Sequence, residues 1–189
     1  FFKELGKKRA LLPRHEKDIN PWAPGCYTTM IRVKQKHRLL ENELYSAEKM
    51  AAHASSLGLA EYHRKDLEEA MMDLAFAEFH DILPGSCIPA GEEGALRLIG
   101  HGLEILSRVK ARAFFALSSG QSKGNEGEIP ILVYNPHPFQ VAGIVECEFE
   151  PSEPNFGKSY LNPRVYQKGM PLPSQAEKEQ SNLNAEWRK

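Results

Sequence analysis

Residues 30–58 read MIRVKQKHRLLENELYSAEKMAAHASSLG, and this stretch decides the fold of the chain. Apolar and small side chains, with one histidine, recur in it at alternating steps of three and four, which places them on one side of a helix. The positions are Met30, Val33, His37, Leu40, Leu44, Ala47, Ala51 and Ala54. We expect a long amphipathic helix that Thr28 or Thr29 caps at its N-terminus and that Gly58 ends.

Two further stretches show the same helical spacing. Residues 60–79 present one row of four positions, Leu67, Met71, Leu74 and Glu78. Pro84-Gly85 stops this helix. Residues 92–117 again step by three and four, at Ala95, Ile99, Gly102, Leu106, Val109, Ala113 and Ala116. Three amphipathic helices with short connections predict an antiparallel three-helix bundle over residues 26–118.

The flanks of the helical region differ in composition. Residues 1–25 are basic and then rich in turn-forming residues, so we expect an extended lead-in. Residues 119–128 are polar and glycine-rich, which is typical of a linker. From residue 129 the spacing of apolar residues changes to two, and residues 162–173 have the pattern of a strand pair that turns at Lys168-Gly169. We expect residues 129–189 to be the incomplete start of a β-sandwich region, and the fold class to be α+β.

The bulk composition narrows the function. The chain of 189 residues is 41% hydrophobic and 26% charged, as soluble globular domains are, and its formal net charge is −1. This charge balance does not indicate a nucleic acid partner, and no apolar run reaches the ~18 residues that a membrane span needs. Cys26, Cys87 and Cys147 are few and widely spaced, which fits a reducing compartment. We therefore expect a cytoplasmic protein that binds neither nucleic acid nor membranes.

The segment FHDILPGS, residues 79–86, holds the strongest candidate for a functional site. His80 and Asp81 stand where the second helix is expected to stop, and the free carbonyl groups of a helix end make the local potential negative. An imidazole there can bind a zinc ion, and a neighbouring carboxylate can bind hydroxyl groups of a ligand. The alternative is that the two residues only cap the helix and form a turn. Spacing and composition leave both interpretations open.

Four short motifs follow one another along most of the chain. They are GCYTT at 25–29, FHDILPGS at 79–86, VYNP at 133–136 and GMPLPSQ at 169–175. In this order they resemble motifs of the glycoside hydrolase family 38 α-mannosidases, in the form typical of the bacterial branch. The resemblance implies an internal piece of such an enzyme, which covers the middle three-helix domain and the start of the C-terminal β region.

The resemblance also implies a reaction and a role for two residues. Enzymes of this family hydrolyse terminal α-mannosides with retention of configuration, by means of two carboxylates. A zinc ion in them binds sugar hydroxyl groups, and one of its histidine ligands matches His80. The aspartate that follows binds the sugar and matches Asp81. The nucleophile, the acid/base and the remaining zinc ligands belong to an N-terminal catalytic domain in the family, so no catalytic residue is assigned to this chain.

This interpretation has consequences for the surface. The chain alone should be inactive, because the catalytic residues belong to another domain. Its expected partners are an α-mannoside substrate and the N-terminal catalytic and C-terminal β domains of the intact enzyme. Six large apolar residues lie outside the helix stripes, and we expect them to be exposed for contact with those domains: Ile31, Leu39, Phe76, Phe79, Leu103 and Phe115. The alternative function is a stand-alone helical protein-interaction module without catalysis, whose apolar faces bind partner helices.

Overall fold

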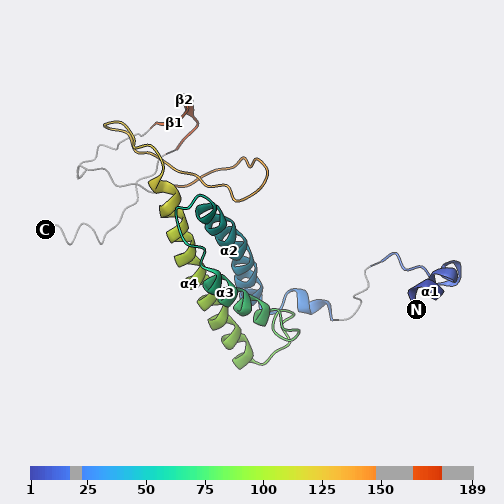
Figure 1. Cartoon of the computed structure of the whole chain (residues 1–189). Coiled ribbons are helices and arrows are strands. Elements are labelled where there is room, and N and C mark those ends of the chain that lie inside the picture. The colour runs from blue at the N-terminus through green and yellow to red at the C-terminus, as the bar shows by residue number, and fades with distance from the viewer. Residues whose placement is uncertain (18–22, 148–163, 176–189) are drawn as a thin grey trace. The chain divides into compact units, whose positions relative to one another are not determined.

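A computed structural model describes residues 1–17, 23–147 and 164–175. Its elements in these ranges are α1 (Phe2–Lys7), η1 (Arg9–Leu11), η2 (Pro24–Tyr27), α2 (Ile31–Ser56), α3 (Arg64–Ala77), α4 (Pro89–Ser119), β1 (Val165–Gln167) and β2 (Met170–Leu172) (Figure 1). The chain divides into two units, residues 1–142 and 143–189. No helix in the described ranges has the apolar length that a bilayer requires. The described part is thus mostly helical with one two-stranded antiparallel sheet, which is consistent with the α+β class.

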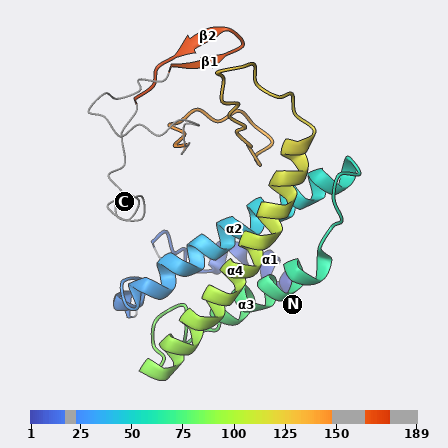
Figure 2. The ribbon, with the colours of Figure 1, turned by 90° about the vertical axis from the view of Figure 1, so that its left-hand side faces the viewer.

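Helices α2, α3 and α4 contact one another pairwise and share one hydrophobic core (Figure 2). We call these three helices the helical core. Its largest fully buried side chains are Val33 and Leu40 of α2 and Ile99, Leu106 and Val109 of α4. Burial of one aliphatic side chain of this size contributes about 1.5–3 kcal/mol. Gly102 lets α4 approach its neighbours, because a Cβ atom on it would lie 3.0 Å from Cδ1 of Leu40.

The predicted stripes agree with burial in α2 and α4, whereas the row predicted for α3 is correct only in part: Leu67 is buried and Leu74 packs against the core. The buried residues of α3 are Leu67, Ala70, Asp73 and Ala77. Met71 is 50% exposed instead. Ala70 and Ala77, which the spacing places beside this row, are buried, and their small side chains allow close helix packing. α4 also begins earlier than predicted, since Pro89 occupies its first turn, where no N–H partner is needed.

The N-terminal residues correct two predictions. The lead-in that we predicted to be extended contains α1, η1 and η2. Neither threonine caps α2, because its N-cap residue is Met30, which has the left-handed conformation and makes no side-chain cap bond. Both threonine hydroxyl groups point elsewhere: Thr28 Oγ1 donates to the carbonyl oxygen of Gly25, and Thr29 Oγ1 donates to that of Pro84.

The strands predicted from residue 129 onward are not found in the described residues up to 147, which form no regular secondary structure and bend at residues 137–139. A strand needs a neighbour that satisfies its N–H and C=O groups, and the apolar residues here have no second layer to cover them: Ile144 is 96% exposed. Tyr134 is the exception in part, since its ring packs on the helical core and its hydroxyl group lies 3.5 Å from the carbonyl oxygen of Lys49. Residues 148–163 and 176–189 of the predicted β region lie outside the described residues.

The strand pair predicted around Lys168-Gly169 is confirmed. β1 and β2 pair antiparallel, with Val165 opposite Leu172 and Gln167 opposite Met170. The φ angles of Lys168 and Gly169 are 50° and 79°, and two consecutive positive values are typical of the two-residue type I′ turn.

Candidate functional site

The connection between α3 and α4, residues 78–88, carries the motif that the sequence singled out. Its backbone is wound into successive turns, in which the N–H groups of Ile82 and Gly85 donate to the carbonyl oxygens of Phe79 and Ile82 at 2.8 and 3.0 Å. The side chain of Ile82 is buried in the hydrophobic core and so fixes the connection to the three helices. We call residues 79–87 the site loop.

His80 and Asp81 lie at the surface of the site loop. His80 follows the C-cap residue of α3, Glu78, by two positions. The side chain of His80 is 79% exposed and that of Asp81 is 51% exposed, and Nε2 of the histidine lies 3.7 Å from Oδ2 of the aspartate. The ring of Phe79 lies beside the imidazole, with 4.3 Å between the centroids. The structure therefore presents an imidazole and a carboxylate side by side to whatever binds this surface.

The backbone and side chain of Asp81 are fixed by the residues after the turn. The N–H groups of Ser86 and Cys87 both donate to the carbonyl oxygen of Asp81, at 3.0 and 2.9 Å. The hydroxyl group of Ser86 donates to Oδ1 of the same residue at 3.2 Å. Oδ1 is thus engaged inside the loop, whereas no hydrogen bond within the described residues is formed by Oδ2, which remains directed toward the imidazole.

The site loop also contacts the second motif that the sequence singled out, GCYTT at 25–29. Thr29 Oγ1 donates to the carbonyl oxygen of Pro84 at 3.0 Å. Nζ of Lys34 donates to the carbonyl oxygen of Thr29 at 2.6 Å and lies 3.4 Å from that of Pro84. On the other side of the loop, Nε2 of His37, a buried residue of α2, lies 3.3 Å from Oε1 of Glu78. Glu78, the residue directly before the loop, is thus held by a buried histidine of α2.

The donors of the site loop suit zinc in type but are too few to hold it by themselves. A zinc site in a protein takes three or four ligands. Among residues 1–17, 23–147 and 164–175, no group of three or more His, Cys, Asp or Glu side chains is arranged to hold a metal ion. The chain can offer the imidazole of His80 and the carboxylate of Asp81 to a metal and its ligand, and other ligands have to come from outside the described residues.

A histidine–aspartate pair between α3 and α4 was not predicted. Nδ1 of His101 lies 2.7 Å from Oδ2 of Asp73, which is 8% exposed, and Nε2 lies 3.8 Å from Oε1 of Glu69. The hydrogen bond to Asp73 raises the pKa of His101 above its ordinary value of 6.5, and the charges of Asp73, Glu69 and Glu104 act in the same direction against desolvation. The sequence signal was available, because Asp73 lies one helical turn from both Ala70 and Ala77 on the buried face of α3.

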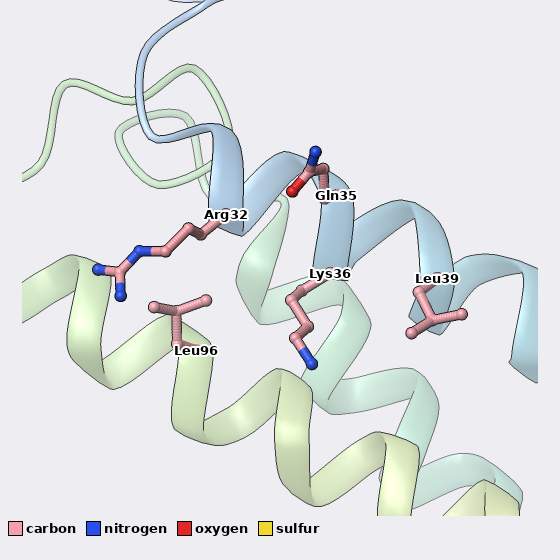
Figure 3. Close-up of a pocket in the computed structure, with 5 residues that line it drawn as sticks. All are labelled: Arg32, Gln35, Lys36, Leu39 and Leu96. Atoms are coloured by element: carbon pink, nitrogen blue, oxygen red, sulfur yellow. The ribbon is translucent and has the colours of Figure 1, made fainter. Parts of the chain in front are cut away.

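A shallow pocket lies between α2 and α4, away from the site loop. It is lined by Arg32, Gln35, Lys36, Leu39 and Leu96, and Figure 3 shows Arg32 and Lys36 extended from α2 toward α4. A second pocket lies between the end of α3 and the start of α4, where Phe76, Ile82, Leu98 and His101 contribute to its lining. Neither pocket contains His80 or Asp81, so neither is the predicted site.

Exposed apolar side chains occur where the sequence predicted them. Five of the six named residues are exposed: Ile31, Leu39, Phe76, Phe79 and Phe115. The sixth, Leu103, is partly buried against the core. Phe76 and Phe79 are 56% and 50% exposed and flank the end of α3 next to His80, so the polar pair borders an apolar surface.

Comparison with known proteins shows which family the helical region matches. Residues 22–115 match the family described as the alpha mannosidase middle domain. The chain is similar to an alpha-mannosidase of Saccharomyces cerevisiae, with 38% identity over 66 residues, which are 34% of this chain and 6% of the yeast protein. It is also similar to alpha-mannosidase G of Dictyostelium discoideum, with 27% identity over 106 residues, 52% of this chain and 9% of that protein. No solved structure matches the chain.

The match covers two of the four motifs, GCYTT and FHDILPGS, whereas VYNP and GMPLPSQ lie beyond it. The matched region begins just before GCYTT, includes the site loop and ends near the C-terminus of α4. The aligned segments span less than a tenth of either curated relative. Residues 22–115 are therefore an alpha mannosidase middle domain, as the resemblance to the glycoside hydrolase family 38 α-mannosidases implied.

Proposed function

We propose that this chain is the part of a retaining, zinc-dependent α-mannosidase that contributes one zinc ligand, His80, and one sugar-binding carboxylate, Asp81, to an active site completed by an N-terminal catalytic domain. The observation that carries the proposal is the exposed pair on a hydrogen-bonded loop inside the matched domain. Two adjacent donors at a surface are what a partial site requires, because the remaining ligands and the two catalytic carboxylates come from elsewhere.

The two residues have different roles in this proposal. The imidazole of His80 would be one ligand of the zinc ion, which when bound orients sugar hydroxyl groups. The carboxylate of Asp81 would accept hydrogen bonds from those hydroxyl groups, and charged acceptors form stronger bonds than neutral ones. Ser86 supports this role, since its hydroxyl group occupies Oδ1 and so holds the carboxylate in one orientation. No catalytic residue is assigned to the chain, and the chain alone is inactive in this proposal.

The exposed apolar residues support the proposed partners. Phe76 and Phe79 beside His80 would be covered by the catalytic domain, so that the boundary of the active site excludes water. The packing of α2, α3 and α4 around one core supports a three-helix bundle as the architecture that presents the loop. The alternative, a stand-alone interaction module, also uses exposed apolar faces, but it gives no role to His80 and Asp81.

Replacement of the two residues in the intact α-mannosidase tests the proposal. His80→Ala removes a ligand, so bound zinc should fall and hydrolysis of an aryl α-mannoside should drop more than about 100-fold, beyond the usual effect of residues behind the ligands. Asp81→Asn should keep zinc but lower kcat/KM about 100-fold, since charge-assisted hydrogen bonds contribute roughly 1.5–3 kcal/mol each. His63→Ala is the matched control, because His63 lies at the other end of α3. Full activity of both site variants would refute the proposal.

A further inference from the structure

Thr29, just before α2, and Lys34 and His37 in its first turns contact the chain on both sides of His80 and Asp81. At the α3 end, the buried imidazole of His37 contacts Glu78, the residue directly before the loop. At the far end, Thr29 and Lys34 contact the carbonyl oxygen of Pro84. His80 and Asp81 lie between these two attachments. Because Lys34 and His37 are one helical turn apart, they lie on the same side of α2.

The carbonyl group of Pro84 is the point through which α2 acts on the loop. Proline has no N–H group, so this carbonyl is the only backbone hydrogen-bonding group of residue 84. It receives the hydroxyl hydrogen bond of Thr29 and lies within reach of the Lys34 ammonium group. Of the N–H groups that follow, that of Gly85 donates to Ile82, and those of Ser86 and Cys87 donate to the carbonyl oxygen of Asp81. A shift of Pro84 would therefore be transmitted to the backbone of Asp81.

The backbone has an unusual conformation on both sides of the contact between Thr29 and Pro84. Met30 has φ 47° and ψ 48°, a left-handed conformation that is strained for a residue with a side chain, by about 1–2 kcal/mol. This conformation places Thr29 outside α2, and the sulfur atom of Met30 lies 3.5 Å from Sγ of Cys87. Gly85 has φ +88°, and a Cβ atom on it would lie 2.1 Å from Oγ1 of Thr29. Strain that persists at such a site indicates a functional constraint.

We infer that Thr29 and Lys34 are positioning residues for the active site: they fix Pro84 and thereby hold His80 and Asp81 in the geometry that zinc and sugar require. This inference rests on the proposed function of those two residues. Residues behind metal ligands typically change metal affinity or activity 10- to 100-fold when they are replaced. Thr29 and Lys34 bond to Pro84 and not to His80 or Asp81, so their effect must pass through the backbone of the loop.

Amide hydrogen exchange of the 189-residue chain tests the contact itself without metal or substrate. The matched pair is Thr29→Val and Thr28→Val, because the hydroxyl group of Thr28 donates only locally, to Gly25. Thr29→Val should speed exchange at Gly85, Ser86 and Cys87 about 5- to 10-fold, since one hydrogen bond is lost. Thr28→Val should leave these amides unchanged, and Thr29→Ser should restore protection. Equal exchange in Thr29→Val and Thr28→Val would overturn the inference.

Zinc affinity of the intact enzyme, measured by competition with a chelator, tests the consequence. Thr29→Val should weaken zinc binding about 10-fold and lower kcat more than it changes KM, while Thr28→Val and Thr29→Ser should bind zinc like the wild type. If Thr29→Val does not fold, Lys34→Met gives the second measurement and should act in the same direction. Unchanged zinc affinity in Thr29→Val, with zinc lost in His80→Ala, would refute only the positioning role. Zinc and activity retained in His80→Ala would refute the proposed function instead.

Discussion

The helical core contains two connections between consecutive helices, and they are built differently. The connection from α2 to α3, residues 57–63, ends α2 through local bonds: the N–H groups of Gly58 and Leu59 donate to the carbonyl oxygens of Ser55 and Ala54. The connection from α3 to α4 is tied through Pro84 to Thr29 and Lys34, which lie 55 and 50 positions earlier in the chain. Both contain a glycine with positive φ, at 70° for Gly58 and 88° for Gly85.

The difference between the two glycines shows what each connection is for. A Cβ atom on Gly58 would have no atom within 4 Å, so this glycine is needed only for its backbone angle. A Cβ atom on Gly85 would overlap Thr29. The first connection only reverses the chain, whereas the second holds a loop in one position against a distant segment. The loop held in this way is the one that carries the exposed His80 and Asp81.

Substitution of the two glycines should separate the connections most strongly. Gly58→Ala should cost about 1 kcal/mol of unfolding free energy, because only the left-handed conformation is strained. Gly85→Ala adds steric overlap, so it should cost about 3 kcal/mol or more. Urea unfolding followed by circular dichroism measures both. Equal losses in the two variants would mean that the loop moves away from Thr29 without penalty.

One apolar residue from each connection should show a smaller difference in unfolding free energy. Ile82 is 6% exposed, and Ile82→Ala should cost about 2–4 kcal/mol, as for other aliphatic core residues. Leu59 in the first connection is 43% exposed, and Leu59→Ala should cost less than about 1 kcal/mol. The same urea unfolding experiment compares them. A loss in Leu59→Ala as large as that in Ile82→Ala would show that the first connection is also anchored in the core.

The smallest expected effect is a pH dependence of the α3–α4 pairing. The pKa of His101 is raised in the folded chain, so the stabilisation from its contact with Asp73 is complete below pH 6.5 and is lost as the pH rises through the higher folded-state value. Unfolding midpoints should therefore fall slightly from pH 6 to pH 8.5. His101→Gln should remove this part of the pH dependence, and His53→Gln, on the exposed face of α2, should keep it. An unchanged pH profile in His101→Gln would exclude the pair as its source.

Helix existence was predictable from the sequence because burial follows the helical period. The stripes of α2 and α4 needed only the positions of apolar residues, and Gly58 needed only its place after the last of them. The β1–β2 turn was predictable for a similar reason, since Lys168-Gly169 suits two positive φ angles. These features depend on residues that are close together in the sequence.

Features that depend on distant residues were not predictable in the same way. Thr29 is of a residue type that often caps helices, and only the proximity of Pro84 explains why its hydroxyl group donates to that residue instead. The helical period places Asp73 on the buried face of α3, but only the fold shows that His101 lies beside it. The alternation after residue 129 favours strands, but a strand also requires a neighbour, which alternation cannot supply. For the candidate site, the motif indicated His80 and Asp81, whereas the residues that hold their loop were not predicted.

The contact between Thr29 and Pro84 also limits how far the His-Asp motif can be transplanted. The eight residues of FHDILPGS look like a portable unit, since their internal hydrogen bonds are local. Their attachment points, however, are Thr29, which precedes α2, and Lys34 in α2, and Met30 between them has a left-handed conformation that an ordinary helix start does not provide. A designer who grafts the motif onto another helical hairpin would copy His80 and Asp81 without the contacts that hold their loop. The smallest transferable unit is therefore residues 25–37 together with 78–87, two segments that only the fold brings together.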